Sequence, residues 1–207
     1  SVAVLDGVTG KLRKTISLGG PAKMDIVRRG EFLFHDATQC FQNWLSCVSC
    51  HPRTRADGVN WDLLNDGITN PKNAKSLVGS WRTPPAIALG VRSSMEVAGE
   101  KGFRFIQFIQ PEDDVLKAVR AYLRDIKHIP SPYHRKPDGT LDASASRGKK
   151  IFAKAGCSDC HPAPLYTDLR MYDVGTRNAR NLKGRSEFDT PSLIELYRTG
   201  PYLHDGR

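Results

Sequence analysis

The stretches CVSCH at residues 47–51 and CSDCH at residues 157–161 share one spacing, Cys-x-x-Cys-His. This spacing is the attachment pattern of c-type haem: each thiol forms a thioether with a haem vinyl group, and the His supplies an axial nitrogen to the iron. Because the pattern occurs twice, it predicts two covalently bound c-type haems. The predicted cofactor-binding residues are Cys47, Cys50, His51, Cys157, Cys160 and His161, with His51 and His161 as iron ligands.

Two other chemistries also use paired cysteines. Zinc modules combine Cys and His, but their Cys-x-x-Cys pairs normally lie within tens of residues of each other, and here the two pairs are 110 residues apart. A dithiol redox motif normally belongs to a βαβ pattern, which this sequence does not show. Haem is therefore preferred, and zinc and dithiol chemistry remain as alternatives.

Cys40 is a fifth cysteine, outside both motifs. Thioether formation requires reduced thiols and free haem outside the cytosol, so we expect a periplasmic or otherwise exported protein. In such an oxidising compartment an unpaired thiol is unusual. We expect Cys40 to be a buried apolar side chain, and a crosslink to a partner or to a residue outside this chain is the alternative.

Landmarks around the two motifs recur in the same order. A glycine followed by apolar residues precedes each motif, at 30–34 and at 148–152, and a Thr-Pro pair follows each, at 83–84 and at 190–191. The distances from His to Thr are 32 and 29 residues. This repetition predicts a duplicated unit, and hence two tandem cytochrome c-like haem domains, mainly α with long loops.

Three stretches carry helix signals. We expect one helix over Met24 to His35, a second that begins at Pro111, and a third from Asp142 or Ser144 to Ala155. The second has acids in its first turn and an apolar stripe that we assign to the core. The stripe consists of Val115, Val119, Tyr122 and Ile126.

The chain divides into four predicted segments. Residues 1–20 read as a short β-hairpin, because two β-prone runs flank a Gly-containing turn. The first unit is residues 21–130, a polar linker rich in Pro and Gly spans 131–141, and the second unit is residues 142–207. Because both ends of the sequence lie within a pattern, we expect the chain to be part of a longer protein, with the second unit incomplete.

The composition and charge of the chain argue against a membrane-spanning protein and indicate an acidic protein partner. The 207 residues carry a formal charge of +9 and are 39% hydrophobic, so the chain can bury a core. No apolar run approaches the length of a membrane span, so we expect no span. Residues 135–185 hold eleven Lys or Arg and five Asp, which favours an acidic redox partner. We expect no nucleic-acid binding, because no recognition motif accompanies the charge.

The two haem motifs, each followed by Thr-Pro, resemble the dihaem bacterial cytochrome c peroxidase family, which includes MauG. The most specific similarity lies in the stretches FDTPSL at 188–193 and YRTGPYLHDG at 197–206. The resemblance implies an oxidoreductase in which the second haem passes electrons to the first, where peroxide reacts. Residues 1–20 resemble the end of a YVTN-type β-propeller repeat.

The resemblance also implies candidate catalytic and axial residues. The family has a distal Glu beyond the first Thr-Pro, and the acids nearest that place are Glu96 and Glu100, which could act in general acid/base catalysis. For the second haem, Met171 is the local candidate for a sixth ligand. The first haem has no nearby downstream His, so its sixth position is open or takes Met95 or His35.

Calcium between the units is a further implication of the resemblance. The family uses a Thr-x-Pro segment, matched here by residues 199–201, together with an Asn whose position corresponds to Arg82. A cation there would repel calcium, so calcium is an alternative and not an expectation. Trp44, Trp61 and Trp81 lie in the first unit, where we expect them to pack against the haem, and an electron relay between the irons is the alternative.

The leading prediction is thus a periplasmic dihaem c-type cytochrome with electron transfer and peroxidase-like or MauG-like activity at the first haem. An electron-transfer module that performs no peroxide chemistry is the alternative.

Overall fold

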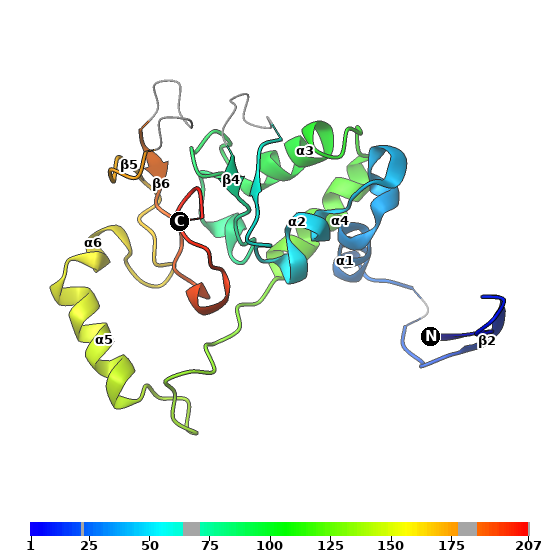
Figure 1. Ribbon diagram of the computed structural model, residues 1–207, viewed down its shortest axis with the longest axis horizontal. Coiled ribbons are helices and arrows are strands. Elements are labelled where there is room, and N and C mark those ends of the chain that lie inside the picture. The colour runs from blue at the N-terminus through cyan, green and yellow to red at the C-terminus, as the bar shows by residue number, and fades with distance from the viewer. Residues whose placement is uncertain (22, 64–70, 178–185, 207) are drawn as a thin grey trace.

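The computed structural model describes residues 1–21, 23–63, 71–177 and 186–206. The chain forms short helices and two-stranded sheets joined by long loops (Figure 1). Helices are α1 Ile26–His35, α2 Cys47–Cys50, α3 Met95–Phe105, α4 Asp113–Asp125, α5 Ala143–Lys154 and α6 Cys157–Cys160. Strands are β1 Val2–Leu5, β2 Leu12–Ile16, β3 Asn60–Trp61, β4 Lys72–Asn73, β5 Met171–Tyr172 and β6 Phe188–Asp189. Single 3₁₀ turns are η1 Ala37–Gln39, η2 Phe41–Asn43, η3 Pro52–Thr54, η4 Ser80–Arg82 and η5 Leu196–Arg198.

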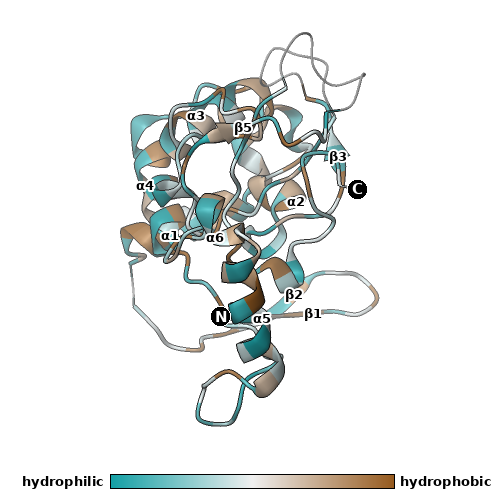
Figure 2. Ribbon diagram, turned by 90° about the vertical axis from the view of Figure 1, so that its left-hand side faces the viewer, coloured by the Kyte–Doolittle hydropathy of each residue, from teal (hydrophilic) through white to brown (hydrophobic). Residues whose placement is uncertain are grey.

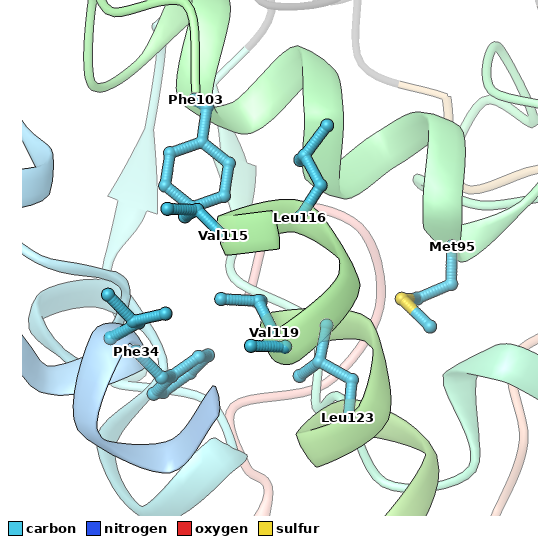
Figure 3. Close-up of a cluster of buried hydrophobic side chains, with 9 residues drawn as sticks. Phe34, Met95, Phe103, Val115, Leu116, Val119 and Leu123 are labelled. Carbon is cyan, nitrogen blue, oxygen red and sulfur yellow. The ribbon is translucent and has the colours of Figure 1, made fainter. Parts of the chain in front are cut away.

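The main core lies where α1 crosses α4 in the first unit (Figure 3). Gly30 permits this crossing, because a Cβ added to it would lie 2.0 Å from the carbonyl oxygen of Ala118. Aromatic packing continues the contact, with Phe34 and Tyr122 ring centroids 5.4 Å apart. The buried residues of this cluster are Leu33, Phe34, Met95, Phe103, Val115, Leu116, Ala118, Val119 and Leu123.

In the second unit, α5 precedes its Cys-His motif as α1 precedes the first. Asp142 caps α5 by accepting a hydrogen bond from the backbone of Ala145. None of the residues of α5 is buried, and a Cβ at Gly148 would meet nothing within 4 Å in the described structure. Figure 2 shows α5 extending away from the helices of the first unit.

The later part of the second unit packs back onto the first. Sheet β5–β6 lies against residues 85–90, where the backbone of Asp189 donates to the carbonyl of Ala88. Phe188 joins Ala88 and Leu89 in a small second core and stacks on His204, with ring centroids 4.2 Å apart. The two units are therefore in contact through segments far apart in the sequence.

The N-terminal hairpin makes a separate, exposed sheet. β1 and β2 pair antiparallel, with Val2 opposite Ile16, and every residue of both strands is exposed. In Figure 1 this hairpin projects from the rest of the molecule. No helix in the described ranges combines the length and apolar character needed to cross a bilayer.

The structure confirms the hairpin and the three predicted helices, although the second begins at Asp113 and not at Pro111, and in the described ranges it adds α2, α3 and α6. The predicted helix over Met24 to His35 begins at Ile26 with Asp25 as its cap, and Asp142 rather than Ser144 caps α5. Helix α3 was not predicted, because Gly99 and Gly102 interrupt its apolar pattern. The fold is helix-rich with small sheets, consistent with the predicted mainly-α class.

Candidate functional site

The two Cys-x-x-Cys-His stretches adopt the same backbone geometry. Each pair of cysteines lies on a single helical turn, α2 or α6, and the His that follows donates its backbone N–H to the first Cys carbonyl at 3.0 Å. His51 has φ −120° and ψ 60°, and His161 has φ −119° and ψ 59°. Both sulfurs and the imidazole of each motif are thus presented from one compact turn.

The imidazole of each motif is held by a backbone carbonyl a few residues downstream. The Nδ1 of His51 lies 3.2 Å from the carbonyl oxygen of Arg55, and the Nδ1 of His161 lies 2.9 Å from that of Tyr166. An Nδ1–H that donates to a carbonyl leaves Nε2 as the nitrogen suited to bind a metal. This arrangement is compatible with the predicted role of both histidines as iron ligands.

The first motif is more enclosed than the second. Burial raises the pKa of Cys47 to about 12, and burial together with the charge of Asp57 raises the pKa of Cys50 to about 11. Burial also lowers the pKa of His51, even though backbone carbonyls oppose the shift. Cys157 is exposed. The same local turn thus lies in two different environments.

Gln107 is a polar residue of this site that sequence reasoning missed. It is 3% exposed, and its Oε1 lies 3.7 Å from the Sγ of Cys47. Its Nε2 is buried and has no hydrogen-bond partner in the described structure. A buried amide donor without a partner beside Cys47 could therefore bond to a polar group of a molecule bound there. Nothing in the sequence around residue 107 indicated this role, since Gln107 lies 60 positions from Cys47.

The candidate catalytic acids lie on α3 and pair with cations on α4. Glu96 accepts a hydrogen bond from Arg124 at 2.7 Å, and Glu100 lies 3.5 Å from Lys101 and 4.0 Å from Arg120. Burial alone would raise the pKa of Glu96, but the Arg124 hydrogen bond and charge hold it below its ordinary value. Glu96 is thus held as a carboxylate, a form that suits a base better than an acid.

The candidate sixth ligands lie in three different settings. The Met171 sulfur packs against the backbone of Gly90 in the first unit, where an added Cβ would be 2.8 Å from it. Met95 is 4% exposed and belongs to the α1–α4 core. His35 bonds through Nδ1 to the Glu31 carbonyl and lines a surface cavity of about 430 Å³. Each side chain therefore already makes packing contacts or hydrogen bonds within the protein.

The three tryptophans and Cys40, which the sequence also singled out, differ in how far their side chains are exposed. Trp44 and Trp81 are 53% and 43% exposed, whereas the indole N–H of Trp61 donates to Asp57 at 2.8 Å. Cys40 is a free thiol with 3% exposure, in agreement with the expected buried apolar side chain. Within the described ranges no three His, Cys, Asp or Glu side chains form a metal-binding group, so the zinc alternative gains no ligand set there.

The Thr-x-Pro segment meets an asparagine, but the residue is Asn73 and not the position taken by Arg82. The amide Nδ2 of Asn73 donates to the carbonyl of Pro201 at 2.6 Å, and the Arg82 guanidinium instead lies over the Trp81 ring. Sheet β3–β4 thus places Asn73 beside this segment, and the correspondence of Arg82 with the family's Asn stays a prediction. The Pro201 carbonyl already accepts a hydrogen bond there, and calcium gains no direct support.

Comparison with curated proteins finds haem-protein relatives along most of the chain. It is 32% identical to the hydrazine synthase gamma subunit of Kuenenia stuttgartiensis, over 90% of this chain and 67% of that protein. It is 24% identical to MauG of Methylorubrum extorquens and 28% identical to the cytochrome-c peroxidase IdrP1 of a Pseudomonas species, each over 90% of the chain. The chain spans about two thirds of the length of these relatives. No family model matches it.

Solved structures share the fold. A chain of the Kuenenia stuttgartiensis hydrazine synthase, from a crystal pressurised with xenon, superposes with a TM-score of 0.77 and 29% identity, over 90% of this chain and 76% of that one. A MauG-like protein associated with microbial copper homeostasis gives a TM-score of 0.68 over 92% of this chain and 73% of that one, and its 23% identity supports the fold alone.

Proposed function

Because the chain belongs to the family of MauG-like and cytochrome-c-peroxidase-like haem proteins that includes the hydrazine synthase gamma subunit, we propose that it is a dihaem c-type cytochrome with oxidoreductase activity. One observation carries the proposal: two Cys-x-x-Cys-His turns with the same backbone geometry, each with its imidazole Nδ1 on a carbonyl. Electron transfer between the haems, with peroxide chemistry at the first, is the proposed activity.

The residues of this chain would hold and orient the cofactors. A bound c-type haem supplies an iron that accepts and donates single electrons. Cys47 with Cys50, and Cys157 with Cys160, would anchor the two rings, while the Arg55 and Tyr166 carbonyls keep each imidazole in the ligand tautomer. Gln107 would present its buried amide N–H beside the first ring.

Haem counting tests the proposal. A pyridine haemochrome assay on the purified chain is expected to give two c-type haems per polypeptide. Replacing Cys47 and Cys50 with Ala should leave one haem, and the matched Cys157→Ala/Cys160→Ala variant should also leave one. A haem-free chain that binds zinc would contradict the proposal.

Electron transfer without peroxide chemistry is a second candidate, and the ion pairs of Glu96 and Glu100 favour it. An acid that protonates peroxide must carry a proton, and the Arg124 partner stabilises the ionised form of Glu96. If the half-reduced protein consumes peroxide and Glu96→Gln or Glu100→Gln slows it at least tenfold, the peroxidase activity stands. If no peroxide is consumed, the electron-transfer role stands.

The proposed partner is an acidic redox protein outside the cytosol. Helix α5 supports this, because it carries four cations and no acid, and all four are exposed. An acidic partner would be attracted to such a surface at a rate that falls as salt rises. The four are Arg147, Lys149, Lys150 and Lys154.

The exposed hairpin β1–β2 has the character of a sheet fragment that pairs elsewhere. Its strands expose Val2, Leu5, Leu12 and Ile16 at 44–61%, and an isolated hairpin is only marginally stable in water. We propose that it belongs to a β-propeller repeat. Amide hydrogen exchange tests this: exchange in β1 and β2 should be fast in the 207-residue chain and slow in a polypeptide that includes the propeller.

A further inference from the structure

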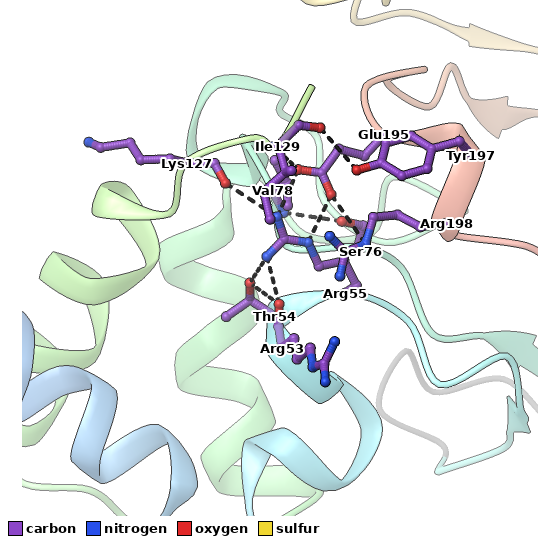
Figure 4. Close-up of polar contacts among 10 residues, drawn as sticks. All are labelled: Arg53, Thr54, Arg55, Ser76, Val78, Lys127, Ile129, Glu195, Tyr197 and Arg198. Atoms are coloured by element: carbon purple, nitrogen blue, oxygen red, sulfur yellow. Dashed lines mark hydrogen bonds and ion pairs between the residues drawn. The ribbon is translucent and has the colours of Figure 1, made fainter. Parts of the chain in front are cut away.

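In the described ranges, Arg55 and Lys75 of the first unit each pair with an acid of the second, and these acids lie on either side of the second Thr-Pro. The Arg55 guanidinium binds Glu195 through two contacts, Nε to Oε2 at 2.9 Å and Nη2 to Oε1 at 2.7 Å (Figure 4). Lys75 Nζ lies 2.8 Å from the Oδ2 of Asp189. Both carboxylates are buried, since the Glu195 side chain is 1% exposed and that of Asp189 is 7% exposed.

One cation of these pairs, Arg55, also contacts the histidine of the first motif through its backbone. The Arg55 carbonyl oxygen lies 3.2 Å from His51 Nδ1. Arg55 thus faces His51 with its backbone and Glu195 of the second unit with its side chain.

Further hydrogen bonds fix the positions of both members of the Arg55–Glu195 pair. Arg55 also donates to the Thr54 hydroxyl and to the carbonyls of Arg53 and Lys127, which uses its whole guanidinium (Figure 4). Glu195 accepts the backbone N–H of Ile129 at 2.5 Å and adopts a left-handed φ of +61°. A non-glycine residue keeps such a conformation only where its surroundings hold it there, so the carboxylate has one defined position.

We propose that Glu195 of the second unit is a positioning residue for His51, the proposed axial histidine of the first, acting through Arg55. This inference rests on the proposed function, because it requires a haem at His51. The second unit thereby sets the orientation of the first iron's ligand. Second-sphere hydrogen bonds to an axial imidazole tune the reduction potential of the metal it binds.

Among the described residues, the contacts that hold His161 show no such dependence on the first unit. Its Nδ1 bonds to the Tyr166 carbonyl, which also accepts the backbone N–H of Leu193, and both residues belong to the second unit. A change at Glu195 should therefore alter the first haem and leave the second unchanged.

The test uses the full 207-residue holoprotein with Glu195→Gln and with Arg55→Lys, which removes the two-pronged contact to Glu195. Asp114→Asn is the matched control, because Asp114 pairs with Arg29 within the first unit and both side chains are about half exposed. Haem content is measured first, then both reduction potentials by spectroelectrochemistry, and then the electron paramagnetic resonance g values of each ferric haem. The Cys47→Ala/Cys50→Ala protein identifies which signals belong to the first haem.

We expect Glu195→Gln to keep two haems and to change the reduction equilibrium of the first haem about tenfold, ~59 mV for one electron. Its g values should change, while those of the second haem and of Asp114→Asn should not. If Glu195→Gln does not fold, Arg55→Lys keeps the test, because it leaves a positive charge beside the buried Glu195 carboxylate while it removes the fixed guanidinium.

Two haems with unchanged first-haem potential and g values in both variants would overturn the positioning role and leave the proposed function intact. Equal shifts of both haems, or the same shift in Asp114→Asn, would also overturn it. Fewer than two haems in the unsubstituted protein would instead refute the proposed function.

Discussion

The two Cys-His motifs of this chain share backbone geometry but not surroundings. Helix α1, which precedes the first motif along the chain, packs so closely against α4 that Gly30 has no room for a side chain. In front of the second, α5 has no buried residue, and the equivalent Gly148 faces open space in the described structure. Local sequence therefore makes the attachment turn, and packing partners decide how enclosed it is.

The largest stability effect is expected at the bridge between the two units. Glu195→Gln leaves the buried Arg55 guanidinium without its counter-charge, which should lower the free energy of unfolding by about 3–5 kcal/mol. Asp114→Asn removes an exposed pair and should cost at most ~1 kcal/mol. Urea denaturation of both holoproteins measures this difference, and equal losses would show that the bridge is not structural.

The two glycines offer the next test. Gly30→Ala places a Cβ 2.0 Å from the Ala118 carbonyl oxygen, so α1 and α4 must separate, at a cost of about 1–3 kcal/mol. Gly148→Ala meets no neighbour and replaces a poor helix former, so it should be neutral or stabilise by up to ~1 kcal/mol. Thermal unfolding followed by circular dichroism compares the two, and a similar loss in both would mean that α5 is packed in solution.

The bridging acids should respond to pH in opposite directions. Burial opposes ionisation of Glu195, but Arg55 and the Ile129 N–H hold its pKa below the ordinary value. The ionised Glu195 therefore stabilises the fold at a pH above the pKa it has in the unfolded chain. This stabilisation is lost as pH falls through the pKa it has in the folded protein. Burial raises the pKa of Asp189 despite Lys75, so its ionisation opposes folding above the unfolded pKa.

The destabilisation by Glu195→Gln should therefore shrink as pH falls from 7 into the range below the unfolded glutamate pKa. Any gain in stability from Asp189→Asn should be largest near neutral pH and should fade as the medium becomes more acidic. Unfolding free energies of each variant against the unsubstituted protein across this range give the signs. The same sign for both variants would contradict the assigned directions.

The smallest effect is expected on the exposed face of α5, and it is kinetic. Lys149→Glu/Lys150→Glu should slow electron exchange with an acidic redox protein about tenfold at low salt, and the difference should shrink as salt screens the charges. Lys11→Glu/Lys14→Glu in the hairpin makes the same charge change far from the second motif along the chain. Stopped-flow rates that fall equally for both pairs would indicate a general charge effect and not a docking face.

Elements with a strong local signal were predictable. Helix α4, with acids in its first turn and an apolar stripe, and the Asp142-capped α5 follow from their own residues, because helix-end charges, caps and i, i+4 contacts act within a few positions. Helix α3 was missed because its two glycines weaken the pattern, although Ser94 accepts the Val97 N–H as a cap. Gln107 was missed because its partner, Cys47, lies 60 positions away.

By itself, the sequence determined the two Cys-x-x-Cys-His turns and the hairpin, since these depend on residues a few positions apart. Only the tertiary structure decided how enclosed each turn is and which side chains join the two units. The joining pairs are separated by 140 and 114 positions, Arg55 with Glu195 and Lys75 with Asp189, and no local pattern records such pairs. The physical reason is that charge burial and close helix crossing become defined only when distant segments meet.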